Sequence, residues 1–172
     1  MSNHQPQLLN EAGQLAREVI SRFGQRGLSL ATCESLTGGL IGATLTSVPG
    51  SSRVYRGGLI TYHSDLKVAL ARVDAQWVAE AGVVNASTAR QMAAGAAMAC
   101  GADVAVAVTG VAGPDPSDGQ PVGTVWMGLA LPADWDEPSR AQSFEFPGDR
   151  GEIRAWTSLR SLQWLLEVAS ES

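Results

Sequence analysis

The stretch LSLATCESLTGGLIGATL, residues 28–45, contains the transition that decides the fold. Its first six residues are mainly apolar, as in a buried strand, and residues 38–47 place apolar side chains at the spacing of a helix. Between the two patterns lie a glutamate, a serine, a threonine and two consecutive glycines. A strand that passes through a short glycine-containing loop into a helix is typical of an α/β protein.

The loop in this stretch has the composition of an anion-binding helix start. Ser35, Thr37, Gly38 and Gly39 lie where the first N–H groups of the helix have no partner, and glycine lets a ligand approach the backbone closely. A phosphate or a developing oxyanion would fit there. Plain capping by Thr37, with the glycines only turning the chain, explains the same residues equally well. The loop has neither of the glycine motifs of nucleotide-binding proteins.

The rest of the chain alternates between helical and strand patterns. Helices are expected near residues 8–23, 64–65, 74–81, 87–100 and 150–170, and strands at 58–62, 103–109, 122–131 and 142–146. This order predicts a three-layer α/β/α sandwich with a mixed, mostly parallel sheet, and residues 1–172 as a single domain. Ligands of such folds bind where strands end and loops lead into helices.

Composition limits the class of protein. The chain has 172 residues, 45% of them hydrophobic, which suffices for one buried core. A net charge of −5 argues against binding to nucleic acid or to an anionic membrane surface, since both require a basic face. No apolar run approaches the ~20 residues of a membrane span, and Cys33 and Cys100 lie in apolar surroundings. We therefore expect a cytoplasmic protein with free thiols.

A second polar loop follows the predicted strand at residues 103–109. Thr109 and Gly110 begin a segment rich in glycine, proline and aspartate that extends to residue 121. Loops of this length in a compact domain often carry function, although a plain surface loop has the same composition. Arg150, at the start of the last predicted helix, is a third candidate for ligand binding.

The chain offers little conventional catalytic chemistry. Its two histidines, His4 and His63, do not support a serine–histidine–aspartate triad, and no histidine or cysteine pair has the spacing of metal ligands. A hydrolase built here would need a lysine base, and Lys67 is the candidate. Its pKa would have to fall by roughly three units from ~10.4, which costs about 4 kcal/mol and requires burial or a nearby cation. These residues alone favour a solvated Lys67.

Several motifs together resemble the CinA C-terminal domain family, whose members include nicotinamide mononucleotide (NMN) deamidases. The similarity covers nearly the whole chain, and the order and spacing of its motifs are specific. The matching segments are residues 31–39, 49–52, 56–58 with Tyr62 and Lys67, 109–115, 121–126 and 146–150.

The resemblance implies an amidohydrolase that converts NMN to nicotinic acid mononucleotide and ammonia in pyridine nucleotide (NAD) salvage, without a metal or cofactor. By matching positions it implies Ser52 as the nucleophile, Lys67 as its base and Tyr62 nearby; Ser35 is a second candidate nucleophile, because it also lies at a helix start. Residues expected to bind substrate or the oxyanion are Ser35, Thr37, Gly38, Gly39, Thr109, Gly110 and Arg150.

Two alternatives remain open at this stage. The first is a non-catalytic nucleotide-binding or regulatory module of a competence/damage-inducible, CinA-like protein. The second is a structural or interaction protein in DNA uptake or the damage response, although the acidic balance argues against direct contact with nucleic acid. The resemblance also suggests a homo-oligomer, either a dimer or a larger assembly, with no membrane partner.

Overall fold

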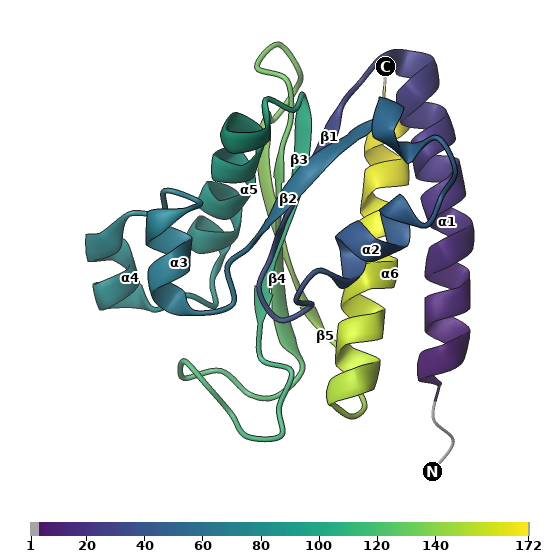
Figure 1. The fold of residues 1–172 in the computed structure, drawn as a ribbon. Coiled ribbons are helices and arrows are strands. Elements are labelled where there is room, and N and C mark those ends of the chain that lie inside the picture. The colour runs from purple at the N-terminus through teal and green to yellow at the C-terminus, as the bar shows by residue number, and fades with distance from the viewer. Residues whose placement is uncertain (1–3, 172) are drawn as a thin grey trace.

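A five-stranded sheet lies between two layers of helices (Figure 1) in the computed structural model, which describes residues 4–171. The strands are β1 (Leu30–Glu34), β2 (Tyr55–Ile60), β3 (Val104–Gly110), β4 (Thr124–Ala130) and β5 (Ser139–Glu145), in the spatial order β2-β1-β3-β4-β5. β1 pairs in parallel with β2 and β3, whereas β4 is antiparallel to both of its neighbours. Four strands therefore run in one direction, which confirms the predicted mixed, mostly parallel sheet.

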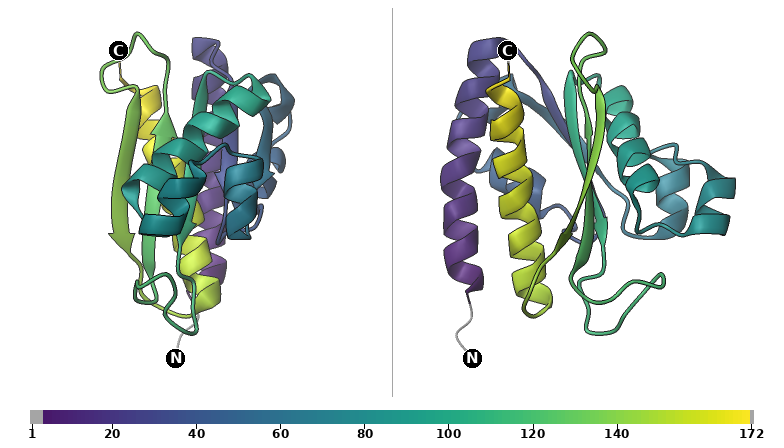
Figure 2. Two further views of the ribbon diagram at one scale, coloured as in Figure 1. Left: turned by 90° about the vertical axis from the view of Figure 1, so that its left-hand side faces the viewer. Right: turned by 180° about the vertical axis from the view of Figure 1, so that it is seen from behind.

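Helices cover both faces of this sheet, as the two further views show (Figure 2). One face carries α1 (Gln5–Arg26), α2 (Leu40–Thr46) and α6 (Arg150–Ala169), and the other carries α3 (Ser64–Ala69), α4 (Ala75–Ala81) and α5 (Ala86–Cys100). A short 3-10 helix, η1 (Ser51–Arg53), precedes β2. β2 begins three residues earlier than predicted, because two glycines in YRGGLI weaken its apolar pattern.

The two faces of the central strand β3 carry side chains of different size. Its valines, Val104, Val106 and Val108, belong to the large core beneath α1 and α6, whereas Ala105 and Ala107 face α5. Small side chains on that face let α5 come close to the sheet. The approach is closest at Gly128 of β4, where a Cβ would lie 2.2 Å from the carbonyl oxygen of Ala89.

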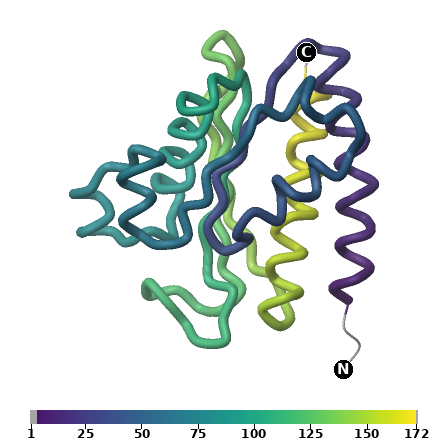
Figure 3. Tube along the Cα trace, in the orientation of Figure 1, coloured from purple at the N-terminus to yellow at the C-terminus, as the bar shows by residue number. Residues whose placement is uncertain are grey.

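The ends of the parallel strands gather at one edge of the sheet. Glu34, the last residue of β1, is in register with Ile60 of β2 and with Val108 of β3. The loops that follow these strands therefore leave the sheet at the same end, and the tube view traces their paths (Figure 3). At this edge the chain continues from β1 toward β2 on one side and from β3 toward β4 on the other. The point between β1 and β3, where these directions diverge, is the usual ligand position in open α/β sheets.

The start of α2 is not free to bind a ligand, because Glu34 caps it. The Glu34 side chain is buried, and its carboxylate accepts hydrogen bonds from the N–H groups of Gly39, Ile41 and Gly42 at 3.0, 3.1 and 2.8 Å. The carboxylate thus takes the place that a phosphate was expected to occupy. The Gly39 N–H predicted to bind substrate is therefore already used within the protein.

The neighbouring residues of this loop are also used internally. Gly38 donates its N–H to the carbonyl of Ser35 at 3.1 Å. Thr37 is fully buried, and its hydroxyl has no hydrogen-bond partner within residues 4–171. Neither lines the cavity described below. Sequence reasoning identified the helix start correctly but assigned its amides to the wrong anion, because the capping carboxylate belongs to the preceding strand.

The close approach of α5 predicts a sharp difference between two glycine substitutions. Gly128→Ala should lower the free energy of unfolding by about 1–3 kcal/mol, because the new methyl group meets backbone rather than a movable side chain. Gly13→Ala, in α1, has no atom within 4 Å of the added Cβ and should instead raise stability by about 0.5–1 kcal/mol. Urea denaturation measures both, and equal midpoints would contradict the packing described.

The capping role of Glu34 predicts that Glu34→Gln destabilises the protein by about 1–3 kcal/mol. Both carboxylate oxygens accept N–H groups, so an amide NH₂ would face a donor on one side. Glu145→Gln is the matched control, since Glu145 is exposed and makes no side-chain hydrogen bond or ion pair among the described residues. Chemical denaturation that gives the two variants the same midpoint would rule out the cap.

Candidate active site

Lys67 is the only lysine in the sequence, and it is buried. It lies on α3, directly after β2, and only 1% of the residue is exposed. Its Nζ donates hydrogen bonds to the carbonyl oxygen of Thr61 at 2.8 Å and to Oγ of Ser35 at 3.0 Å. The solvated lysine favoured from sequence physics is therefore wrong. α3 directs the amine inward to the edge where the parallel strands end.

Burial lowers the pKa of Lys67, because an ammonium group loses its water shell inside the protein. Two neighbours act in the opposite direction, the thiol of Cys33 and the carboxylate of Asp118. Burial also raises the pKa of Cys33 to about 11, so this thiol is uncharged at neutral pH. Asp118 is then the remaining negative group that favours the charged amine.

Ser35 brings an alcohol to this amine from the end of β1. It is 7% exposed, and its N–H donates to the carbonyl of Val108 on β3, which fixes its position relative to the sheet. Arg154 of α6 donates to the carbonyls of the next two residues, Leu36 and Thr37, at 3.1 and 2.8 Å. The loop that carries the serine is therefore hydrogen-bonded to both β3 and α6. A fixed alcohol bonded to a buried amine is the geometry of a nucleophile and its base.

A cavity of about 220 Å³ opens beside this pair. We call it the Ser35–Lys67 cavity, and the residues used below that line it are Ser35, Leu36, Tyr62, Lys67, Val83, Val84, Thr109, Gly110, Asp118 and Arg150. It brings together six of the residues predicted from the sequence. Thr109 is fully buried there and donates its hydroxyl hydrogen to the carbonyl of Val83 at 2.8 Å.

Arg150 and Tyr62 form the rim of the cavity. The guanidinium of Arg150 donates to the hydroxyl of Tyr62 at 2.7 Å and to the carbonyl of Gly113 at 2.8 Å. It therefore joins the loop after β2 to the loop after β3 from its own position at the start of α6. Arg150 makes no ion pair among the described residues, so its charge is available to an anionic ligand.

Asp118 was not singled out from the sequence. Its Oδ2 accepts the N–H groups of Val83 and Val84, both at 2.7 Å, and the exposed residue lines the cavity. The available signal was Asp118-Gly119, a dipeptide typical of tight hairpin turns. Nothing in the sequence showed that the turn would fold back onto residues 83–84.

Ser52 is separated from the proposed base, so the Ser52–Lys67 pair is not formed. It is exposed in η1, before β2, whereas Lys67 follows the other end of that strand. Six residues of strand at ~3.3 Å each put the two ends on the order of 20 Å apart. The interpretation of Ser52 as the partner of Lys67 is corrected to Ser35.

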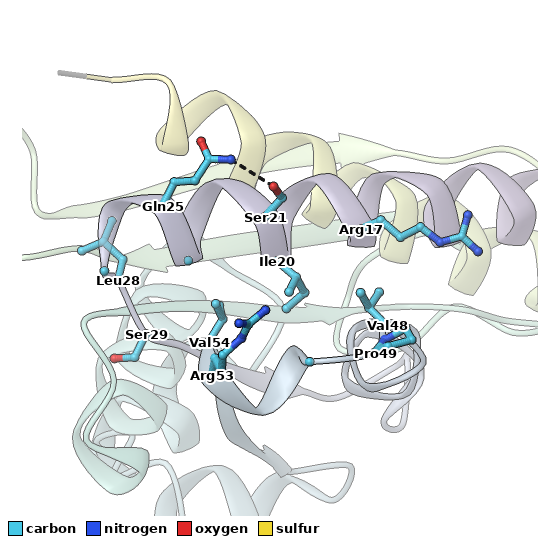
Figure 4. Close-up of a pocket in the computed structure, with 13 residues that line it drawn as sticks. Arg17, Ile20, Ser21, Gln25, Leu28, Ser29, Val48, Pro49, Arg53 and Val54 are labelled. Carbon is cyan, nitrogen blue, oxygen red and sulfur yellow. Dashed lines mark hydrogen bonds between the residues drawn. The ribbon is translucent and has the colours of Figure 1, made fainter.

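A larger cavity, of about 530 Å³, lies near Ser52 but lacks catalytic chemistry (Figure 4). Its ionisable residues are Arg17 and Arg53, which stay protonated and cannot act as bases. Of its serines, Ser21 accepts a hydrogen bond from Gln25 and Ser29 bonds to Asp103. Size alone therefore does not identify the site; the smaller cavity contains the alcohol and the amine.

No group of three or more potential metal ligands comes together within residues 4–171. None of the helices in that range is long and apolar enough to cross a membrane.

Comparison with known proteins identifies the family. Residues 12–169 match the family model of the CinA C-terminal domain. A CinA-like protein of Geobacter sulfurreducens is 46% identical over 148 residues, which are 86% of this chain and 35% of that protein. A putative competence-damage inducible protein of Lacticaseibacillus casei is 42% identical over 140 residues, 81% of this chain and 33% of its own length. The chain thus spans about a third of these curated relatives.

Solved structures agree with this result. A CinA superfamily protein from Klebsiella pneumoniae has a TM-score of 0.87 at 29% identity, with 92% of this chain and 98% of that chain covered. The competence/damage inducible protein CihA from Agrobacterium tumefaciens has a TM-score of 0.86 at 36% identity, with coverage of 92% and 95%. By sequence and by fold, the chain belongs to the CinA C-terminal domain family.

Proposed function

We propose that this protein is an amidohydrolase that converts NMN to nicotinic acid mononucleotide and ammonia, with Ser35 as nucleophile and Lys67 as base. The observation that carries the proposal is the 3.0 Å contact between Ser35 Oγ and the buried Nζ of Lys67. The resemblance of the sequence motifs to a family whose members include NMN deamidases supports the choice of substrate, and residues 12–169 match the model of that family.

The proposed reaction begins with a neutral Lys67. Its amine accepts the hydroxyl proton of Ser35 as Oγ adds to the carbon of the carboxamide. Thr61 accepts a hydrogen from the same amine, which leaves the nitrogen lone pair free to face Ser35. The protonated lysine then gives its proton to the departing ammonia, and a water molecule hydrolyses the ester on Ser35. Burial assists the first step because it favours the uncharged amine.

The negative charge that develops on the carboxamide oxygen requires a donor. The backbone N–H of Leu36 directly follows the nucleophile, and it has no acceptor within residues 4–171. An unpaired amide at this place is the usual source of an oxyanion hole in serine enzymes. We therefore assign the Leu36 N–H to the oxyanion, in place of the amides of Gly38 and Gly39.

The cavity also suggests how NMN would lie. The Ser35–Lys67 pair is at its buried end, so the carboxamide would enter first. Arg150 is exposed at the rim and would receive the phosphate, which leaves the ribose between the two. Arginine suits this role, since its planar group binds phosphate oxygens in pairs.

Two serine variants test the choice of nucleophile. Ser35→Ala should reduce kcat for ammonia release from NMN by about 10³-fold or more, because no other alcohol bonded to Lys67 lines the cavity. Ser52→Ala should leave kcat close to wild type, since Ser52 lies at the other edge of the sheet. Full activity of Ser35→Ala would contradict the assignment.

The same ammonia assay tests the substrate when NMN, nicotinamide riboside and nicotinamide are compared. Preference for NMN over the riboside would show that the phosphate is recognised, and Arg150→Ala should remove that preference. Saturable NMN binding by the wild type without ammonia release would instead support a non-catalytic nucleotide-binding module.

The base role of Lys67 predicts the pH dependence. An amine acts as a base only when neutral, so kcat/KM should rise with pH through the pKa of Lys67. Burial lowers that pKa, so the midpoint should fall below the ordinary ~10.4 of a lysine. Lys67→Arg retains the positive charge at every accessible pH and should lose activity by about 10²–10⁴-fold. A flat profile between pH 6 and 10 would argue against lysine as the base.

A further inference from the structure

The Ser35–Lys67 cavity contains charges of both signs. Its ionisable lining residues are Tyr62, Lys67, Asp118 and Arg150, so Asp118 is the single carboxylate among them. The reaction proposed above uses Lys67 as base and Arg150 as the phosphate site, and it leaves Asp118 without a role. A negative group beside a base that must stay neutral is unfavourable for the base, because it stabilises the ammonium form.

Asp118 is held in place by its own turn. Asp118 and Gly119 both have positive φ, 56° and 69°, as the central residues of a type I′ turn require. Ser117 and Gln120 close this turn through two backbone hydrogen bonds of 3.2 and 2.9 Å. A positive φ is uncommon for a residue with a side chain, and such residues concentrate at functional sites.

The carboxylate is fixed but not neutralised. Oδ2 accepts the two N–H groups of Val83 and Val84, whereas Oδ1 accepts no hydrogen bond within the described part of the chain. No lysine, arginine or histidine forms an ion pair with Asp118 among these residues. The neighbouring Gly82 leaves the necessary room, since a Cβ there would lie 2.3 Å from Oδ1.

We propose that Asp118 recognises a positive charge on the substrate, so that the site selects a zwitterionic amide with a cationic ring at one end and an anionic group at the other. The proposal rests on the proposed function and deepens it, because NMN carries its carboxamide on a pyridinium ring. Asp118 and Arg150 then bind the two opposite charges of one molecule. Asp118 is exposed in the free protein, so water solvates its carboxylate, and a ligand without the ring charge gains no ion pair there and binds less tightly.

The alternative explanation is that Asp118 only holds the segment at Val83 and Val84. Asp118→Asn separates the two, because an amide oxygen can still accept both N–H groups while the charge is lost. Asp115→Asn is the matched control. Asp115 lies on the same loop, is exposed, and makes no side-chain hydrogen bond or ion pair among the described residues.

The experiment measures binding in a Ser35→Ala background, which prevents turnover. The ligands are NMN and its reduced form, which has the same carboxamide, ribose and phosphate on an uncharged dihydropyridine ring. Isothermal titration calorimetry should give NMN the lower Kd by about tenfold or more, equivalent to ~1.4 kcal/mol. Adding Asp118→Asn should reduce this ratio to less than about threefold by weakening NMN alone, and adding Asp115→Asn should leave the ratio unchanged.

Comparing the two ligands cancels any general damage to the cavity. An unchanged ratio in Asp118→Asn, equal weakening of both ligands, or failure of NMN to bind would each overturn the charge-recognition role. Ammonia release by the wild type is measured separately. Its absence would remove the proposed hydrolysis, while the binding ratio would still decide whether Asp118 recognises charge.

Discussion

The hydrogen bond between a buried amine and a serine hydroxyl is the interaction on which the rest of the site depends. Lys67 has exchanged water for two acceptors, Ser35 Oγ and the Thr61 carbonyl. Burial of a charged lysine is costly, and the protein reduces that cost by lowering the pKa of the amine. In the proposed reaction the same lowered pKa would let the lysine act as a base, so stability and reactivity would be coupled at one atom.

The sheet supplies the geometry that this pair requires. β1 ends directly before Ser35 and β2 directly before Thr61, and both strands run in the same direction, so the serine and the acceptor of the lysine meet without a long loop. Glu34 adds a second constraint. Its carboxylate takes up the amides at the start of α2, which makes the loop rigid but leaves those amides unavailable to a ligand. In the proposed function, anion binding therefore falls to the Arg150 side chain at the rim.

The sequence predicted the fold more completely than the site. Strand and helix periods placed the five strands and the six α-helices of the sandwich but not the short helix η1, because burial on a sheet or against a helix leaves a regular apolar pattern that a single 3-10 turn lacks. The structure brings Ser35, Tyr62, Lys67, Thr109, Gly110 and Arg150 together in one cavity, while their catalytic and binding roles stay predictions. The structure differs from the prediction at Gly39 and Ser52. The first difference depends on the direction in which Glu34 points from its strand, and the second on the end of β2 at which the serine lies. Neither property has a local sequence signal.

A bound substrate would connect the effects of the charged residues in the cavity. In the free protein, Asp118 opposes the effect of burial and favours the ammonium form of Lys67. A cationic ring paired with Asp118 would cancel that influence and bring a positive charge near the amine. Both changes disfavour the ammonium form, so binding of the correct substrate would itself release the base. An uncharged amide would leave Asp118 free to keep Lys67 protonated. Selection by charge and activation of the nucleophile would then have a single electrostatic cause.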